Sequence, residues 1–327
     1  MLEVRSALAC DYASAHSPVH EGNLLAVVEF GENEGRPELR EGIPHVPIRV
    51  GADANRFREL WSTGGTVISG RVGELVYSHD GQRMFCAGRI ERSGGYRERT
   101  RAMYAAAFEL ADEQGYPNLF RMWNYIAGIN DDNGEGLEIY RDFCRGRSEA
   151  FAAHDKRIPA ATGVGSRGAG IVCYFLSSRS DPVIHIENPR QVPAYHYPRE
   201  YGPRPPTFAR ATHLAHGGAG TESLFISGTA SILGHATVAP GDVERQCEIA
   251  LDNIRALVGA ENLRAHDIGH GYRLSAIRRA KVYVRHREHL AMVRRKCGAV
   301  FAPDAEIVYL NVDICRRDLL VEIEGVA

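Results

Sequence analysis

The fold of this 327-residue chain is constrained most by an order of elements that occurs twice. The middle of the chain and its C-terminal third each contain two stretches with apolar residues at helical spacing, and strand-like runs precede and follow each stretch. Both regions therefore predict the order β-α-β-α-β-β. In the middle region the expected strands are residues 82–90, 118–129, 168–178 and 182–189, with helices at 96–115 and 136–154. In the C-terminal third the expected strands are 223–228, 278–287, 305–314 and 318–327, with helices at 241–259 and 287–298.

The helix over residues 241–259 has the clearest signals. Asp242 precedes its first turn and is suited to cap the free N–H groups there, and Gly259 follows its last turn. One face between them is apolar at a spacing of three to four residues, formed by Val243, Cys247, Ala250, Ile254 and Leu257. The glycine-rich run "GVGSRGAG" at 163–170 lacks the Gly-Lys-Ser/Thr ending of a phosphate-binding loop and predicts only a turn.

Two fused β-α-β-α-β-β units predict a mixed α+β protein of two domains. We expect residues 1–205 to form the first domain, in which roughly the first 80 residues add strands that complete the unit, and residues 206–327 to form the second. The segment 188–213 holds six prolines among aromatic and arginine side chains, unlike a Gly/Ser-rich linker. It predicts an ordered loop that carries binding groups over the surface.

Composition and charge argue against several classes of protein. The net charge is −2 without a basic tract, so nucleic acid is not an expected partner. No apolar run reaches the ~18 residues of a membrane span, and the N-terminus lacks the pattern of a signal peptide. The seven cysteines are scattered and never form a C-x-x-C pair, and the histidines have no metal-ligand spacing. We therefore expect a cytoplasmic protein without disulfides or bound metal.

Two sets of motifs carry a resemblance to known families. "LFISGTASILGH", "GDVERQCEIALDNIRALVGAENL", "KVYVRHREHL" and the final "LLVEIEGVA" resemble the RidA/YjgF module, a chorismate-mutase-like fold, over the C-terminal third. "MWNYIAGIN", "GLEIYRDFCRGR", "PAATGVGS", "ENP" and "HYPREYGPRPPTFARAT", with the same ending, resemble the chorismatases over residues 115–327. Chorismatases cleave pyruvate from chorismate in bacterial secondary metabolism. The resemblance implies an enzyme that takes chorismate, needs no cofactor, and supplies starter units, as in antibiotic biosynthesis.

Chorismatases divide by product, and two positions distinguish the branches. One branch hydrolyses chorismate to 3,4-dihydroxycyclohexa-1,5-diene carboxylate and has alanine at both positions; another forms 3-hydroxybenzoate. This chain has Gly228 and Cys315 there, which implies a 3-hydroxybenzoate synthase. We expect Cys315 to shape the pocket rather than to act as a nucleophile. RidA trimers bind ligands between subunits, so two fused units imply a monomer with its site between the halves.

The last strand carries the expected acid. Its alternation puts Glu322 and Glu324 on one face and the apolar Val321 and Ile323 on the other. From the residues alone, both glutamates are expected to face solvent. Cleaving an enol ether requires a proton on its methylene carbon, and a carboxylic acid supplies it if burial or a nearby negative charge raises its pKa. The resemblance implies Glu322 as this general acid and leaves Glu324 open between support and solvent.

Two substrate carboxylates require cationic sites, and arginine forks bind carboxylates bidentately. Tyr140 and Arg147 are seven residues apart and share one helix face. The proline-rich loop supplies Tyr197, Arg204 and Arg210. The resemblance implies that all five bind substrate, although any single arginine in so arginine-rich a chain is more often a surface ion pair.

The strand end at 227–229 is the expected pocket floor. Gly228 and Thr229 leave space there and offer backbone or hydroxyl donors, so we expect Gly228 to let the ring sit for attack by its own 4-hydroxyl. A tight turn would explain the glycine equally well.

Four alternatives remain at this point. The first is a chorismate hydrolase that releases the dihydroxy diene. The second is an imine deaminase of the RidA kind, but that activity uses an arginine where this chain has Ile307. The third is a non-catalytic protein that binds a small molecule on the same fold, since a fold does not determine function. A chorismate mutase would share the substrate without needing a general acid.

Overall fold

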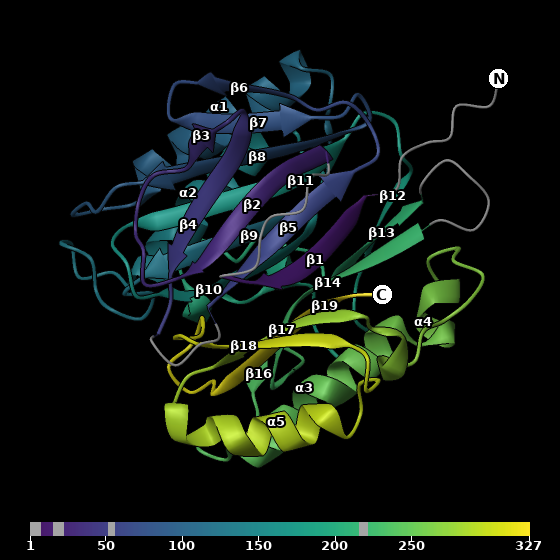
Figure 1. Ribbon diagram of the computed structural model, residues 1–327. Helices are drawn as coiled ribbons and strands as arrows, with labels where there is room; N and C mark the ends of the chain where they lie inside the picture. Colours follow the sequence, from purple (N-terminus) through teal and green to yellow (C-terminus); the bar gives the residue numbers. More distant parts are fainter. Residues whose placement is uncertain (1–7, 16–22, 52–55, 216–221) are drawn as a thin grey trace.

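The computed structural model describes residues 8–15, 23–51, 56–215 and 222–327, which form three large β-sheets with helices outside two of them (Figure 1). Two sheets have six strands and one has five; β15 (Ile232–Leu233) and β16 (Ala236–Thr237) form a small ribbon. The mixed α+β fold class expected from the sequence is confirmed.

The first six-stranded sheet has the order β10-β9-β11-β8-β7-β6, and α1 (Arg97–Glu113) and α2 (Ile139–Ala153) cover its outer face (Figure 1). Its strands are β6 (Ile68–Val72), β7 (Leu75–His79), β8 (Arg83–Ile90), β9 (Asn118–Ala127), β10 (Ala160–Ser166) and β11 (Ile171–Ser178).

The second six-stranded sheet has the order β12-β13-β14-β19-β17-β18, with α3 (Val243–Val258) and α5 (Leu290–Gly298) outside it and the short α4 (Ala260–Arg264) following α3. Its strands are β12 (Val183–Ile186), β13 (Ala211–Ala215), β14 (Glu222–Ala230), β17 (Arg279–Val284), β18 (Glu306–Asn311) and β19 (Val321–Val326).

The two sheets repeat one topology, which confirms the doubled β-α-β-α-β-β order. In the first, β9 pairs with β10 in parallel, and β11 lies antiparallel between β8 and β9. In the second, β17 pairs with β18 in parallel, and β19 lies antiparallel between β14 and β17. The hairpins β6–β7 and β12–β13 extend each sheet at the same edge.

Two details of the sequence prediction are wrong. Residues 160–166 form β10, so the glycine-rich run is a turn only in its second half; small residues are accepted in this strand because a neighbouring element packs closely against it. The strand at 182–189 was expected to end the first repeat, but β12 pairs with β13 of the second sheet, and β11 occupies the place equivalent to β19. The expected domain boundary between residues 205 and 206 stays a prediction.

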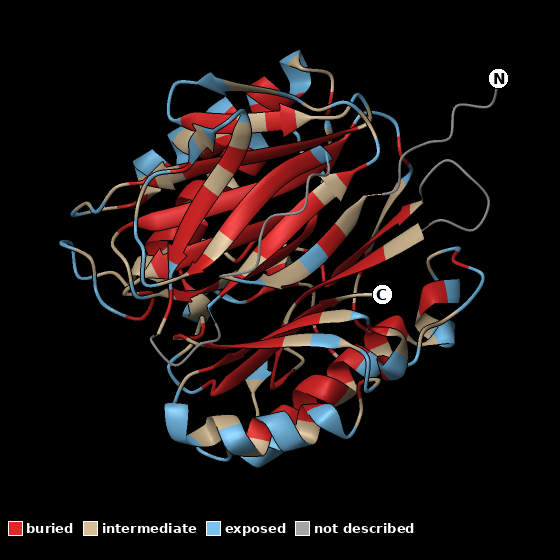
Figure 2. Cartoon of the chain, viewed as in Figure 1, coloured by how far each residue is buried: buried red, intermediate tan, exposed pale blue. Residues whose placement is uncertain are grey.

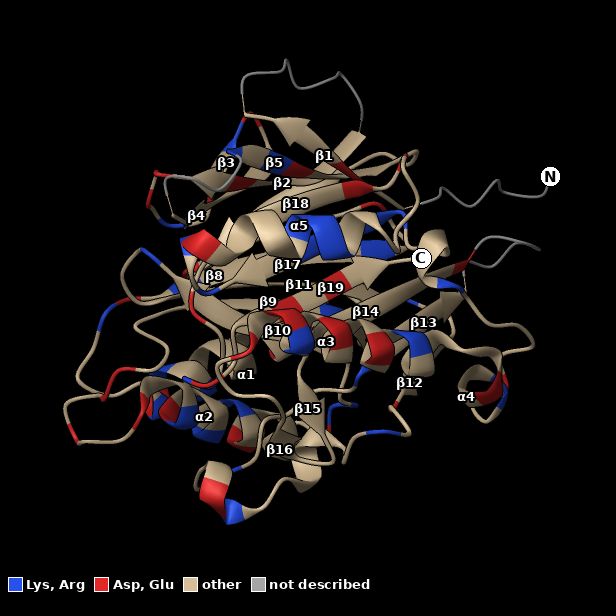
Figure 3. Cartoon of the chain, turned by 90° about the horizontal axis from the view of Figure 1, so that it is seen from below, with Lys and Arg blue, Asp and Glu red and all other residues tan. Residues whose placement is uncertain are grey.

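Helix α3 forms where its apolar stripe and cap predicted. Asp242 accepts a hydrogen bond from the Arg245 N–H at 3.0 Å, which satisfies one of the free donors of the first turn. The stripe residues Cys247 and Ile254 are buried against the second sheet. The outward face of α5 is largely exposed, whereas most of α3 is buried or half-buried (Figure 2). The basic α5 lies beside the acidic face of α3, and Lys296 reaches Glu248 at 2.8 Å (Figure 3).

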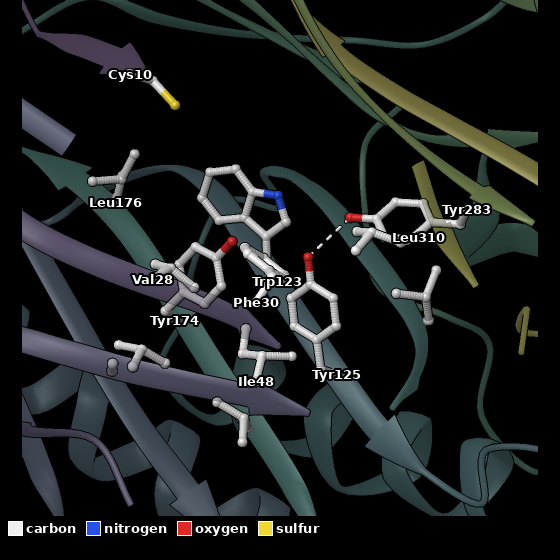
Figure 4. Packing of buried hydrophobic residues seen from close by; sticks show 14 of the residues in the cluster. Cys10, Val28, Phe30, Ile48, Trp123, Tyr125, Tyr174, Leu176, Tyr283 and Leu310 are labelled. Atoms are coloured by element: carbon white, nitrogen blue, oxygen red, sulfur yellow. Dashed lines mark hydrogen bonds between the residues drawn. The ribbon is translucent and has the colours of Figure 1, made fainter. Parts of the chain in front are cut away.

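The N-terminal residues form the third sheet, with the order β1-β5-β2-β4-β3. Its strands are β1 (Ala9–Ser14), β2 (Asn23–Gly31), β3 (Glu38–Arg40), β4 (Ile43–Arg49) and β5 (Phe57–Thr63). One buried cluster joins this sheet to both repeats (Figure 4). The ring centroids of Phe30 and Tyr125 lie 5.5 Å apart, and the Tyr125 hydroxyl lies 2.9 Å from the Tyr283 hydroxyl. The extension therefore packs on both repeats rather than completing the first alone.

Candidate active site

Two adjacent cavities lie between the repeats under the proline-rich loop, which contains the 3-10 turns Ala194–His196 and Arg199–Tyr201. The outer chamber has a volume of 420 Å³ and the inner chamber 40 Å³. They lie side by side and share five lining residues: Tyr140, Pro206, Phe208, Ile232 and Cys315.

The inner chamber lies where the two repeats meet. Ala160 of β10 bridges Ala209, Val164 bridges Ile314, and the Gly165 N–H donates to the Asp313 carbonyl at 2.7 Å. These contacts join the edge of the first sheet to the second, so side chains from α2 and β10 face those from β14 and β19. The site therefore depends on both repeats and on the loop that covers them.

Glu322 lies at the floor of the inner chamber and exposes 3% of its surface. Burial raises the pKa of its carboxyl to about 8, and the negative charge of Glu324 adds to this, while Arg121 and Arg210 act in the opposite sense. The carboxyl therefore holds its proton at neutral pH, which is the state that a general acid requires.

Glu324 behaves in the opposite way, although it lies on the same face of β19. It accepts hydrogen bonds from the Trp123 indole at 2.8 Å, from Arg121 at 2.9 Å and from the Thr162 hydroxyl, and it lies 3.0 Å from Lys281. Burial alone would raise its pKa, but Lys281 and Arg121 with these donors lower it. The strand thus presents one protonated and one ionised carboxyl, and neither faces solvent.

Gly228 is in direct contact with the acid. A Cβ at position 228 would lie 1.9 Å from Oε1 of Glu322, so no side chain fits while the carboxyl keeps its place. Gly228 is not among the glycines with positive φ, so a tight turn does not account for it. Its N–H donates to the Thr162 hydroxyl at 3.0 Å, beside a register shift in the β14–β19 pairing. The glycine makes room for the acid before it makes room for any ligand.

Two buried arginines line the inner chamber. Arg147 donates to the Thr207 carbonyl and to Met122 Sδ at 3.3 Å, and Arg210 donates to the Val192 carbonyl at 3.0 Å and the Tyr197 hydroxyl at 2.7 Å. The Nε–H of each is buried without a partner among the described residues. Buried donors of this kind are costly unless something accepts from them, so the chamber is suited to an anion.

The other expected binding residues divide into two groups. Tyr140 lines both chambers and Tyr197 lines the outer one. Tyr140 and Arg147 share a face of α2 that points into the pocket. Arg204 is exposed and lines neither chamber, and Thr229 is buried with its hydroxyl donating to the Ser227 carbonyl at 2.9 Å. Strand alternation explains Thr229, because its neighbour Gly228 faces the chamber.

Cys315 packs beside the acid. Its Sγ lies 4.0 Å from Oε2 of Glu322 and forms part of both chamber walls. Burial, with the nearby Glu322 charge, raises the pKa of its thiol well above the usual value. A neutral thiol is a poor nucleophile, and the expectation that Cys315 shapes the pocket stays a prediction.

The structure adds residues that the sequence patterns did not single out. Arg316 lines the outer chamber and stacks 3.9 Å from the Tyr201 ring centroid. Arg121 and Lys281 contact Glu324 from two other strands, and Glu59 of a third strand contacts Lys281. A signal existed for Glu59 and Arg121, because the residues two positions away on their strands are all apolar or aromatic.

Within the described residues, no group of three or more His, Cys, Asp or Glu side chains is placed to hold a metal ion. The same part of the chain contains no helix long and apolar enough to cross a membrane.

A buried acid beside unsatisfied arginine donors defines a pocket for proton-transfer chemistry on a small carboxylate. Residues 59–177 match the family described as "Chorismatase FkbO/Hyg5-like, N-terminal". A 3-hydroxybenzoate synthase of Streptomyces hygroscopicus is 52% identical over 311 residues, covering 93% of this chain and 91% of that protein. A chorismatase of Streptomyces rapamycinicus is 44% identical over 307 residues, covering 93% and 92%. A crystal structure of a chorismatase superposes with a TM-score of 0.95 at 44% identity, covering 99% of both chains.

The chain belongs to the chorismatase family, as its motifs implied. The match of residues 59–177 includes most of strand β5 of the N-terminal sheet, which the motif resemblance over residues 115–327 did not reach.

Proposed function

We propose that this protein is a 3-hydroxybenzoate synthase that converts chorismate into 3-hydroxybenzoate and pyruvate. The observation that carries the proposal is the protonated, buried Glu322 in an arginine-lined chamber, held against Gly228. The 3-hydroxybenzoate synthase of Streptomyces hygroscopicus, with which it shares 52% of its residues, supports the same product.

The first step is proton transfer from Glu322 to the methylene carbon of the enol ether. The 4-hydroxyl oxygen attacks C3, and the C3–O bond breaks with its electron pair going to the ether oxygen, which leaves as the carbonyl of pyruvate. The hydroxyl proton returns to the Glu322 carboxylate, so the acid is restored. The resulting arene oxide opens at its C4–O bond, a hydrogen shifts from C3 to C4, and transfer of one proton from C4 to oxygen gives the phenol. No water, metal or redox cofactor enters this balance.

Substrate binding is assigned to the cations and hydroxyls of the pocket. Arg147 and Arg210 have buried donors available for a carboxylate in the inner chamber, and Tyr140 and Tyr197 flank it. We include Arg316 of the outer chamber in this set. Arg204 and Thr229, which lie outside both chambers, have no contact with the pocket that supports a binding role.

The product depends on which oxygen reaches the activated ring. If the substrate ring, the Glu322 carboxyl and Cys315 fill the chamber, attack on the ring by the substrate's own 4-hydroxyl is favoured. If the chamber also has room for water, hydrolysis to the dihydroxy diene is favoured. The 52% identical relative named 3-hydroxybenzoate synthase supports the first course. The hydrolase remains the second candidate because the 44% identical relative carries only the name chorismatase.

We further propose that the enzyme is a cytoplasmic monomer serving secondary metabolism. All seven cysteines are free thiols, in keeping with a reducing compartment. The pocket draws its walls from both repeats of one chain, so a partner subunit is not needed to complete it.

The test is incubation of the purified protein with chorismate, followed by product analysis by proton NMR and mass spectrometry. Pyruvate with 3-hydroxybenzoate is the expected result, and in D₂O the pyruvate methyl should carry one deuterium. Pyruvate with the dihydroxy diene would assign the hydrolase activity instead. Absence of pyruvate would point to a non-catalytic binding protein. A Glu322→Gln variant keeps the shape of the acid without its proton and should release no pyruvate.

A further inference from the structure

Four charged side chains are buried at the junction of the three sheets, outside both chambers. They are Glu59 of β5, Arg121 of β9, Lys281 of β17 and Glu324 of β19, and each exposes at most 3% of its surface. Lys281 Nζ lies 2.5 Å from Glu59 and 3.0 Å from Glu324, and Arg121 lies 2.9 Å from the other oxygen of Glu324. Two anions and two cations thus alternate along one chain of contacts, which we call the charge chain.

Glu59 is the member that ties the N-terminal sheet to the rest. Besides Lys281, it binds the Trp61 indole at 2.7 Å and the Tyr174 hydroxyl at 3.3 Å. No residue of the N-terminal sheet lines either chamber, so Glu59 has no route to the substrate. Buried ion pairs contribute little net stability compared with apolar residues of similar size, so stability alone is a weak reason for this arrangement.

The charge chain reaches the acid through Glu324 and Thr162. Glu324 follows Glu322 on the same face of β19, and its negative charge raises the pKa of the Glu322 carboxyl. The Thr162 hydroxyl donates to Glu324 and accepts from the Gly228 N–H at 3.0 Å and from Arg121 at 2.7 Å. Thr162 thus connects Gly228, which contacts the Glu322 carboxyl, to Glu324, the anion that acts on that carboxyl.

We propose that the charge chain is a positioning device for the reaction: Glu59 holds Lys281, Lys281 and Arg121 hold Glu324 as an anion, and Glu324 favours the acid form of Glu322. This inference rests on the proposed role of Glu322 and gives the N-terminal sheet a part in it. Glu59, Lys281 and Glu324 are positioning residues, since none contacts the pocket.

The direction in which the Glu322 pKa shifts depends on every titratable or charged group that faces the Glu322 and Glu324 carboxyls. Around Glu324 and Glu322 these are Tyr12 of β1, Glu59 of β5, Arg121 and Tyr125 of β9, Tyr140, Cys144 and Arg147 of α2, Tyr174 of β11, Arg210 before β13, Lys281 and Tyr283 of β17, and Cys315. The tyrosines and the two cysteines are neutral because burial raises their pKa, so Glu59, Arg121, Arg147, Arg210 and Lys281 set the local field.

The decisive variant is Glu59→Gln, which removes one charge and keeps the shape. Lys281 then acts on Glu324 and Glu322 without its counter-charge, so Glu322 gives up its proton at lower pH. We expect the alkaline limb of kcat for pyruvate release to move down by about half to one pH unit, with KM unchanged. The matched control is Glu29→Gln on β2 of the same sheet, whose partners Arg40 and His45 are not part of the charge chain; its profile should stay that of the wild type.

A second variant keeps the proposal testable if Glu59→Gln does not fold. Glu59→Gln combined with Lys281→Met removes the buried pair as a unit, which stability tolerates better than a lone charge. It takes away the cation that most strongly holds Glu324 as an anion, so Glu324 ionises less readily and the alkaline limb should again move to lower pH. If both variants fold and their kcat falls at the same alkaline pH as that of the wild type, the charge chain has no such role, although the proposed function stands. A wild-type enzyme that releases no pyruvate would instead overturn the proposed function itself.

Discussion

Replacing Gly228 by alanine tests the contact between strand β14 and the acid. The new Cβ would lie 1.9 Å from Oε1 and 2.8 Å from Cδ of Glu322, whereas Cβ atoms essentially never approach another heavy atom within 3.0 Å. The carboxyl oxygen must therefore retreat by about 1 Å, because the opposing atoms of β14 belong to the backbone and are held by the sheet.

The size of the effect follows from that displacement. A catalytic group moved by about 1 Å costs roughly 100-fold in rate, equivalent to about 2.7 kcal/mol of transition-state stabilisation. KM should change little, because Arg147 and Arg210 are untouched. The displaced acid also leaves the ring less tightly enclosed, so the share of dihydroxy diene among the products should rise.

The assay is steady-state pyruvate release coupled to lactate dehydrogenase, with products quantified by proton NMR. Gly163→Ala is the matched control, because it adds the same methyl group to the same chamber but meets Tyr140 only at an ordinary 3.4 Å. The control should lose at most about threefold. Gly228→Ala with wild-type rate and product, in a protein that melts normally, would refute the argument that this glycine makes room for the acid.

Three further predictions follow from the charges of the site. Because burial raises the Glu322 pKa to about 8, kcat/KM should be level below that pH and fall tenfold per unit above it; a profile that falls already near pH 5 would contradict the assignment. The unfolded chain ionises Glu322 near pH 4.5 and the folded chain only near 8, so this residue lowers stability as pH rises between those values. Glu322→Gln should therefore stabilise the protein by on the order of 2–4 kcal/mol at pH 8, with the difference vanishing near pH 4.5; thermal unfolding at both pH values checks this, and an equal difference at both would speak against it. Arg210→Lys loses the fork that binds Tyr197 and Val192, so KM for chorismate should rise about tenfold to 100-fold with a smaller change in kcat, and an unchanged KM would remove Arg210 from the binding set.

Several features of the site were readable from local patterns. The alternation of β19 predicted that Glu322 and Glu324 share one face, and both are buried. The seven-residue spacing put Tyr140 and Arg147 on one face of α2, and both line the inner chamber. These patterns hold because side-chain direction follows from the periods of strand and helix. The importance of Gly228 was also expected, but the reason was not: its partner is a carboxyl nearly a hundred residues further along the chain.

Two strand predictions were wrong because tertiary packing, rather than local composition, decided whether a segment forms a strand and with which strand it pairs. Residues 160–166 lack the large apolar side chains of a typical strand, because β10 lies where the second repeat approaches its backbone. Strand β12 has the composition of a closing strand, yet its pairing partner is β13. Arg204 is exposed and lines neither chamber, so its expected binding role stays a prediction.

The sequence by itself determined the doubled order of elements, the family, and the candidate acid, because periodicity, caps and motifs are local properties of the chain. Only the tertiary structure decided the protonation of the two glutamates. Glu322 keeps its proton because its burial is uncompensated, and Glu324 loses its proton because Lys281 and Arg121 surround it. Those two cations come from strands far apart in the sequence, and the anion that holds Lys281 comes from a third sheet. Two glutamates in one short strand thus differ through the charges that folding brings to each.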